Sequence, residues 1–171
     1  MAQAVDRGTR EFACRTYGAD MPYGDWAGVT RDLTTALERL SEGEFVILGE
    51  PSPGPRRTLL SRHPALPPTR YVQAMRIEEI LSAECVGATS LGGTWEMPDV
   101  MIDQLRDMGW LTPEESRAEF GNVTPNFDTY VELTSAIALG DLMVASLALL
   151  GAQPQALVLQ CSEDGLSAVT G

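Results

Sequence analysis

The amino-acid sequence predicts a single α+β domain, in which a mainly antiparallel β-sheet packs against one N-terminal helix and two C-terminal helices. Three observations lead to this prediction. An apolar stripe at helical spacing comes first, a run of short apolar segments separated by proline and glycine follows, and two further helical stripes precede a last short strand. The 171 residues, 44% of them hydrophobic, suit one domain with a sizeable core.

The domain boundaries follow from where this periodicity begins and ends. We expect residues 23–162 to form the domain. Residues 1–22 show no periodicity and predict a loose N-terminal arm or a short packed segment, and residues 163–171 predict a flexible tail.

The chain is acidic, with a formal net charge of -12. Such a surface repels phosphates and anionic lipids, so we expect a neutral or basic client and neither nucleic acid nor a membrane as partner. The first residues lack the apolar core of a signal peptide, and no apolar run reaches the roughly 18 residues of a spanning helix. The 3 cysteines are widely spaced without a C-x-x-C pair, which indicates reduced thiols, no zinc site and a cytoplasmic protein.

The first helix is predicted within "GDWAGVTRDLTTALERLSEG", residues 24–43. Asp25 can accept hydrogen bonds from the free amides at its start, and Gly43 can adopt the left-handed conformation that ends it. Its apolar residues recur at helical spacing and form one stripe: Trp26, Val29, Leu33, Leu37 and Leu40.

Four strands are predicted next, joined by short turns as in an antiparallel meander. They are "EFVILG" (44–49), "RRTLLSRH" (56–63), "RYVQAMRIE" (70–78) and "ILSAECVGA" (80–88), and proline-rich turns flank the second. Alternation in the third strand places Tyr71, Gln73 and Met75 on one face and Val72, Ala74 and Arg76 on the other.

Two helices and a strand complete the prediction. One helix should run to Met108 with Pro98 in its first turn, and a longer one should span about residues 129–150. Thr112 and Pro113, followed by two glutamates, are typical of a helix start. "QALVLQC", residues 155–161, predicts the closing strand.

Several short motifs occur in an order that resembles the actinobacterial TY-Chap group, whose members are similar to YbjN and to type III secretion chaperones. The segments are "RYVQAMRIEEILSAECVG", "MIDQLRDMGW", "PNF" and "AIALGDLMVASLALLGAQPQAL". The resemblance covers roughly residues 25 to 160. The matching positions are Tyr71, Val72, Gln73, Glu84, Gly109, Trp110, Asn126, Phe127, Pro154 and Leu157. Met108 stands where the pattern has leucine, a swap that a core tolerates.

The resemblance implies helices packed on one side of the sheet, and a protein that binds a peptide or client protein without catalysis, cofactor or metal. Pairing at a sheet edge would give affinity and apolar pockets would select side chains. We expect the partner-binding residues to be Tyr71, Gln73, Met75 and Glu84 on the sheet, followed by Trp95 and Trp110. The resemblance also leaves a homodimer open, although no sequence feature demands one.

Each of these residues also has a structural interpretation. Gln73 and Glu84 lie on neighbouring predicted strands and can form a cross-strand hydrogen bond instead of orienting a peptide. Trp95, Trp110 and Phe127 are large enough for core packing to explain them, and they can equally be anchors for a partner.

Other functions remain as alternatives. Cys85, with His63 as the only histidine, raises the hypothesis of a cysteine-dependent hydrolase, but His63 precedes a proline in a predicted turn, and Cys85 also suits a small buried hydrophobe. The glutamates lack the loop spacing of a calcium site, and "SLGGTW" lacks a phosphate-binding pattern. A structural subunit of a larger assembly is the third alternative.

Overall fold

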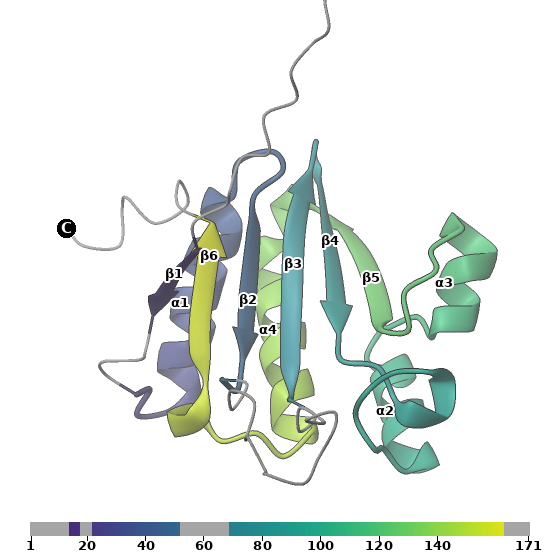
Figure 1. Ribbon diagram of the computed structural model, residues 1–171. Coiled ribbons are helices and arrows are strands. Elements are labelled where there is room, and N and C mark those ends of the chain that lie inside the picture. Colours follow the sequence, from purple (N-terminus) through teal and green to yellow (C-terminus); the bar gives the residue numbers. More distant parts are fainter. Residues whose placement is uncertain (1–13, 18–21, 52–68, 163–171) are drawn as a thin grey trace, which may run out of the picture.

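The computed structural model describes residues 14–17, 22–51 and 69–162. These residues form a six-stranded, fully antiparallel sheet in the order β1-β6-β2-β3-β4-β5 (Figure 1). The strands are β1 Cys14–Tyr17, β2 Phe45–Gly49, β3 Tyr71–Ile77, β4 Ile80–Cys85, β5 Phe127–Glu132 and β6 Val158–Ser162. The predicted α+β class, with a mainly antiparallel sheet, is confirmed.

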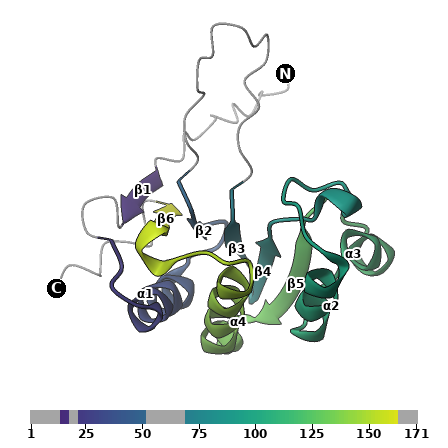
Figure 2. The same cartoon turned by 90° about the horizontal axis from the view of Figure 1, so that it is seen from below.

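Two long helices cover one face of this sheet, and the described residues leave the other face open along β2, β3 and β4 (Figure 2). They are α1, Trp26–Arg39, and α4, Ala136–Leu149. Two shorter helices, α2 Asp99–Asp107 and α3 Pro113–Phe120, lie at the β5 end of the sheet. Short 3₁₀ turns occur at Thr89–Leu91, Leu133–Ser135 and Pro154–Ala156.

The hydrophobic core lies between the sheet and its helical layer. The strands contribute alternate residues to it, and α1 contributes the stripe that the sequence predicts. Fully buried side chains include Val29, Leu33, Leu37, Val46, Leu48, Val72, Leu81, Met143 and Leu147. α1 begins as expected, because the Asp25 carboxylate accepts a hydrogen bond of 2.8 Å from the Gly28 amide.

The α3 helix has a complete capping box at its start. The Thr112 hydroxyl accepts from the Glu115 amide, and the Glu115 carboxylate accepts from the Thr112 amide at 2.8 Å. Pro113 occupies the first turn, which confirms the predicted helix start. α3 is nevertheless an additional C-terminal helix, and it packs against β5 at one end of the sheet.

The predicted helix over residues 129–150 is wrong in its first turns. Phe127–Glu132 form β5, paired with β4, and α4 begins only at Ala136. Tyr130 and Leu133 fit a helical stripe by spacing, but β4 would otherwise have an unpaired edge. Pairing along β4 therefore decides the local structure.

Smaller differences concern the chain ends and one strand. Cys14–Tyr17, within the predicted arm, pair with β6, a partner too distant in sequence to anticipate. Pro98 is the N-cap of α2 and does not lie in its first turn, since its backbone is extended. The predicted strand 56–63 and the tail 163–171 lie outside the described residues.

Candidate functional site

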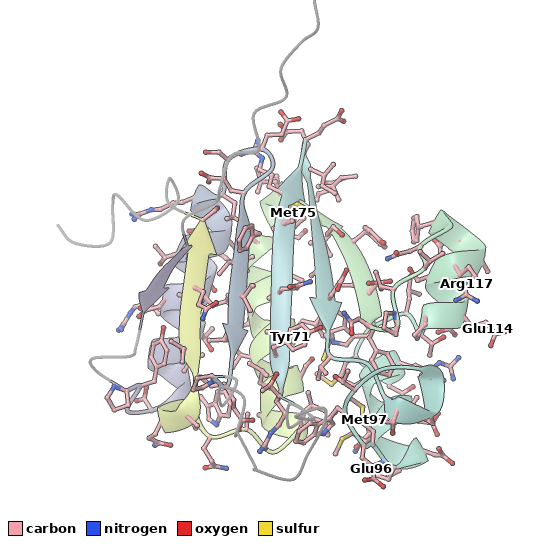
Figure 3. All side chains as sticks on the ribbon, in the orientation of Figure 1. Tyr71, Met75, Glu96, Met97, Glu114 and Arg117 are labelled. Atoms are coloured by element: carbon pink, nitrogen blue, oxygen red, sulfur yellow. The ribbon has the colours of Figure 1, made fainter. Side chains whose placement is uncertain are left out.

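The open face of the sheet is the surface on which the sequence-predicted sheet residues meet. Residues that lie directly opposite each other on neighbouring strands share a face of the sheet. Between β2 and β3 the opposed pairs are Gly49–Tyr71, Ile47–Gln73 and Phe45–Met75. Between β3 and β4 they are Gln73–Glu84 and Met75–Ser82. Figure 3 shows Tyr71 near the start of β3 and Met75 nearer its end. The open face is defined here by these residues together with Ile77, Ile80, Val158 and Gln160. On β5 the same register reaches Asp128 and Tyr130, but this part of the face is covered: Asp128 is 1% exposed, and the Tyr130 ring lies 4.4 Å from the Phe120 ring of α3.

Two neighbouring hollows lie on this face. The first has a volume of about 300 Å³ and is lined by side chains of β2, β3 and β4. They are Phe45, Ile47, Gln73, Met75, Ser82 and Glu84. The second, of about 290 Å³, lies between β3 and β6 and includes Tyr71, Val158 and Gln160. Ile47 and Gln73 line both hollows and so form the ridge between them.

A hydrogen-bonded network joins the polar side chains beside the first hollow. The Gln73 amide donates to Glu84 Oε2 at 3.0 Å, which confirms the predicted cross-strand pair. Asn126 Nδ2 donates to the same Glu84 oxygen at 2.7 Å and to the Tyr71 hydroxyl at 3.0 Å. Asn126 therefore connects two other residues of the TY-Chap resemblance, Tyr71 and Glu84, and Gln73 joins the network through Glu84.

The backbone around Gly87 fixes the position of Asn126. The Gly87 amide donates to Asn126 Oδ1 at 3.1 Å, so the asparagine amide is oriented by bonds at both its ends. A Cβ on Gly87 would lie 1.8 Å from the Pro125 carbonyl oxygen. Only glycine, which has no Cβ, allows the two backbone segments to approach this closely, which explains the glycine just after β4.

Burial dominates the electrostatics of the network and disfavours ionisation of Tyr71 and Asp128. Burial, together with the charge of Glu84, raises the pKa of the Tyr71 phenol above its usual value, so it remains a neutral hydroxyl. Asp128 lies opposite Glu84 across β4 and β5, is 1% exposed, and accepts a 2.8 Å bond from Asn122. Burial and the nearby Glu84 charge raise the pKa of Asp128. Among the described residues no arginine pairs with either carboxylate.

Four of the six predicted partner-binding residues lie on this face, and the two tryptophans lie elsewhere. Trp95 is half-buried beneath the Arg70 guanidinium, which lies 4.9 Å from the ring centroid and also pairs with Glu50 at 3.0 Å. Trp110 is 1% exposed, and its indole donates to the Ser146 hydroxyl at 2.8 Å. Because Trp110 is buried in the core, its side chain has no surface for a partner to contact, and core packing is the interpretation that accounts for it.

Some residues of the open face were absent from the sequence-based prediction. Phe45 and Ile47 form one wall of the first hollow, and alternation along β2 could have revealed them. Asn126 was noticed only as part of the resemblance. Its role depends on a contact across 42 positions of sequence, which no local pattern encodes.

The cysteine and the carboxylates show no arrangement for catalysis or metal binding in the described ranges. Cys85 is fully buried, and burial raises the pKa of its thiol to about 12, so it is a protonated, inaccessible side chain. His63 lies outside the described residues. Within the part of the chain that the structure describes, no three histidine, cysteine or acidic side chains gather as metal ligands.

Comparison with protein families identifies the fold that carries this face. Residues 20–163 match the model of TY-Chap3, the family described as T3SS (YopN, CesT) and YbjN peptide-binding chaperone 3. The chain belongs to the TY-Chap3 family. The match spans α1 to β6 and includes every residue of the open face. No curated protein and no solved structure shows a significant match.

Membership of TY-Chap3 makes this a peptide-binding, chaperone-like domain, as the resemblance implied. Within residues 14–17, 22–51 and 69–162, no helix has the length and apolar character that crossing a bilayer requires.

Proposed function

We propose that this TY-Chap3 domain holds an extended segment of a client protein on its open face, without catalysis. The observation that carries the proposal is the pair of adjoining hollows on a partly apolar sheet face that the described residues leave open along β2, β3 and β4. Met75, Ile77 and Ile80 lie next to each other there and are 41%, 48% and 46% exposed. Exposed apolar side chains that cluster in this way are typical of an interaction surface.

The face is a better candidate than the β5 edge. Leu111 pairs with Asp128 through two backbone hydrogen bonds of 2.8 and 3.0 Å, and so occupies the first part of that edge. By alternation, only Tyr130 and Glu132 direct their backbone groups outward beyond this point. An added strand would therefore form few hydrogen bonds with β5, whereas the open face offers both hollows.

The peptide-binding assignment is tested by selecting binders from a displayed library of random peptides on the purified full chain. Met75→Arg places a bulky, charged side chain beside the first hollow and should abolish recovery of the selected peptides, because the side chain would obstruct the hollow and its charge would have to be desolvated on binding. Val100→Arg is the matched control, because Val100 is 63% exposed on α2 and does not line either hollow.

Retention by the wild type and Val100→Arg, with loss in Met75→Arg, would support the open face as the site. Equal retention by all three folded proteins would contradict it. Circular dichroism on each variant separates lost binding from lost folding. We also propose a cytoplasmic location, which is supported by the buried free thiol of Cys85.

A further inference from the structure

The first hollow combines an apolar wall with hydrogen-bond acceptors that lack a partner. Both bonds that Glu84 accepts from described residues go to Oε2, from Gln73 and Asn126. Oε1 has no hydrogen-bond partner among these residues. Because the Gln73 nitrogen must face Glu84 to donate, the Gln73 carbonyl oxygen is directed elsewhere and is also without a described partner.

The charge around the hollow has one sign. None of its described lining residues is basic, and the buried Asp128 adds a second carboxyl group opposite the half-buried Glu84 on the neighbouring strand. The five ion pairs of the described residues all lie elsewhere. The whole chain carries a net charge of -12, which strengthens the attraction for a cation.

We propose that the first hollow binds an arginine or lysine side chain of the client segment, with apolar client residues on either side of it. This specificity rests on the proposed function of the open face. The aliphatic stem of the basic side chain would pack against Ile47 and Met75 while its donors reach Glu84 Oε1. Arginine and lysine have donors and no acceptors, which complements the free oxygens of the hollow.

The neighbouring surface accounts for the apolar flanks. On one side of the first hollow, Ile77 and Ile80 are exposed at the end of the β3–β4 hairpin. On the other side, across Ile47, the second hollow includes Tyr71 and Val158. A second copy of this chain is a less suitable occupant, because its own open face brings the same Glu84 carboxylate, which no described basic side chain compensates.

The test uses fluorescence anisotropy with the full chain and a labelled, blocked peptide, in which a central arginine is flanked on each side by threonine and leucine. Its partner peptide carries citrulline, which keeps the shape of arginine but removes its charge. The arginine peptide should bind the wild type about tenfold more tightly, as expected for a charge-assisted hydrogen bond to a carboxylate. Because both peptides meet the same protein, this comparison does not depend on any variant.

Glu84→Gln then locates the effect. Its carbonyl oxygen can still accept from Gln73 and Asn126, so the network is kept while the charge is removed. The preference for arginine over citrulline should disappear in Glu84→Gln. It should persist in Glu114→Gln, which changes the net charge equally on α3, away from the open face (Figure 3).

The outcomes separate this inference from the proposed function. Equal binding of the two peptides to the wild type would overturn the basic specificity while leaving peptide binding intact. Failure of both peptides to bind would also overturn it, and the library selection would then decide the function independently. A homodimer in light scattering that Met75→Arg dissociates would show that a second copy occupies the face, and would overturn the inference as well.

Discussion

Asn126 is the residue that organises the open face, although it is not itself in the sheet. It joins the loop before β5 to β3, through Tyr71, and to β4, through Glu84 and Gly87. A partly buried amide with bonds on both sides is well suited to hold strands in one arrangement, because each bond fixes its orientation.

Asn126→Ala should therefore lower the free energy of unfolding by about 1–3 kcal/mol, since it leaves the Gly87 amide and its partners unsatisfied. Urea denaturation measures this change. Gln155→Ala is the control: its amide donates to the Gly24 carbonyl at 3.3 Å on the surface, and its loss should cost within about 0.5 kcal/mol. Equal effects of the two substitutions would contradict the structural role of the network.

At the scale of elements, the start of α3 is held by charge as well as by its cap. Glu115 accepts from Thr112 in the capping box and pairs with Arg106 of α2. The Arg106 guanidinium, followed by the Thr112 hydrogen bonds, lowers the pKa of Glu115 from 4.5 to about 2. This ion pair thus links the end of α2 to the beginning of α3.

The depressed pKa of Glu115 predicts a pH dependence of stability. Between about pH 4.5 and 2 the unfolded chain binds more protons at this group than the folded chain does, so stability is lost as the pH falls through this window. The carboxylate is 38% exposed, and solvent screening keeps the effect small. Thermal unfolding of Glu115→Gln should show a shallower loss below pH 4.5 than the wild type does. Glu114→Gln, on the same turn but without an ion pair in the described structure, should follow the wild type; a matching change there would contradict this assignment.

The segment from Phe127 to Leu149 shows how neighbouring elements decide local structure. The spacing of its apolar residues is near that of a helix and predicts one helix. The first part of the segment is instead the strand β5, because β4 provides an edge with which it pairs. Helical spacing over a few residues is a weak signal when tertiary pairing competes with it.

At the scale of the whole molecule, the fold puts its core on one side of the sheet and so leaves the binding face free. α1 and α4 lie side by side on the covered face, and Gly140 permits their close approach. A Cβ at Gly140 would lie 2.6 Å from the Thr34 hydroxyl oxygen.

Gly140→Ala and Thr34→Ala should therefore be coupled. Alone, Gly140→Ala combines a gain in helix propensity of about 1 kcal/mol with an overlap that costs more than this gain. In the Thr34→Ala background the overlap is absent, and the same change should stabilise the protein by about 1 kcal/mol. Urea denaturation of the four proteins in this double-mutant cycle gives the coupling energy, and additive effects would show that the helices separate easily.

The sequence alone determined the α+β class, α1, and the faces of β3 and β4. These features can be predicted because they depend on short periodicities and helix caps, which involve only residues close together in the sequence. The family was also visible in the order of "YVQ", "E" and "NF" along the chain. Four of the residues chosen from these patterns do lie together on the open face.

Only the tertiary structure decided the rest. It separated Trp110, which is buried against Ser146, from Ile47, which lines both hollows, although the sequence gives the tryptophan more prominence. It showed that β1 and β6 pair, that β5 is a strand, and that Asn126 bridges β3 and β4. Each of these features depends on contacts between distant parts of the chain. The free energy of such contacts outweighs the helix or strand propensity of the local sequence, so no pattern of consecutive residues predicts them.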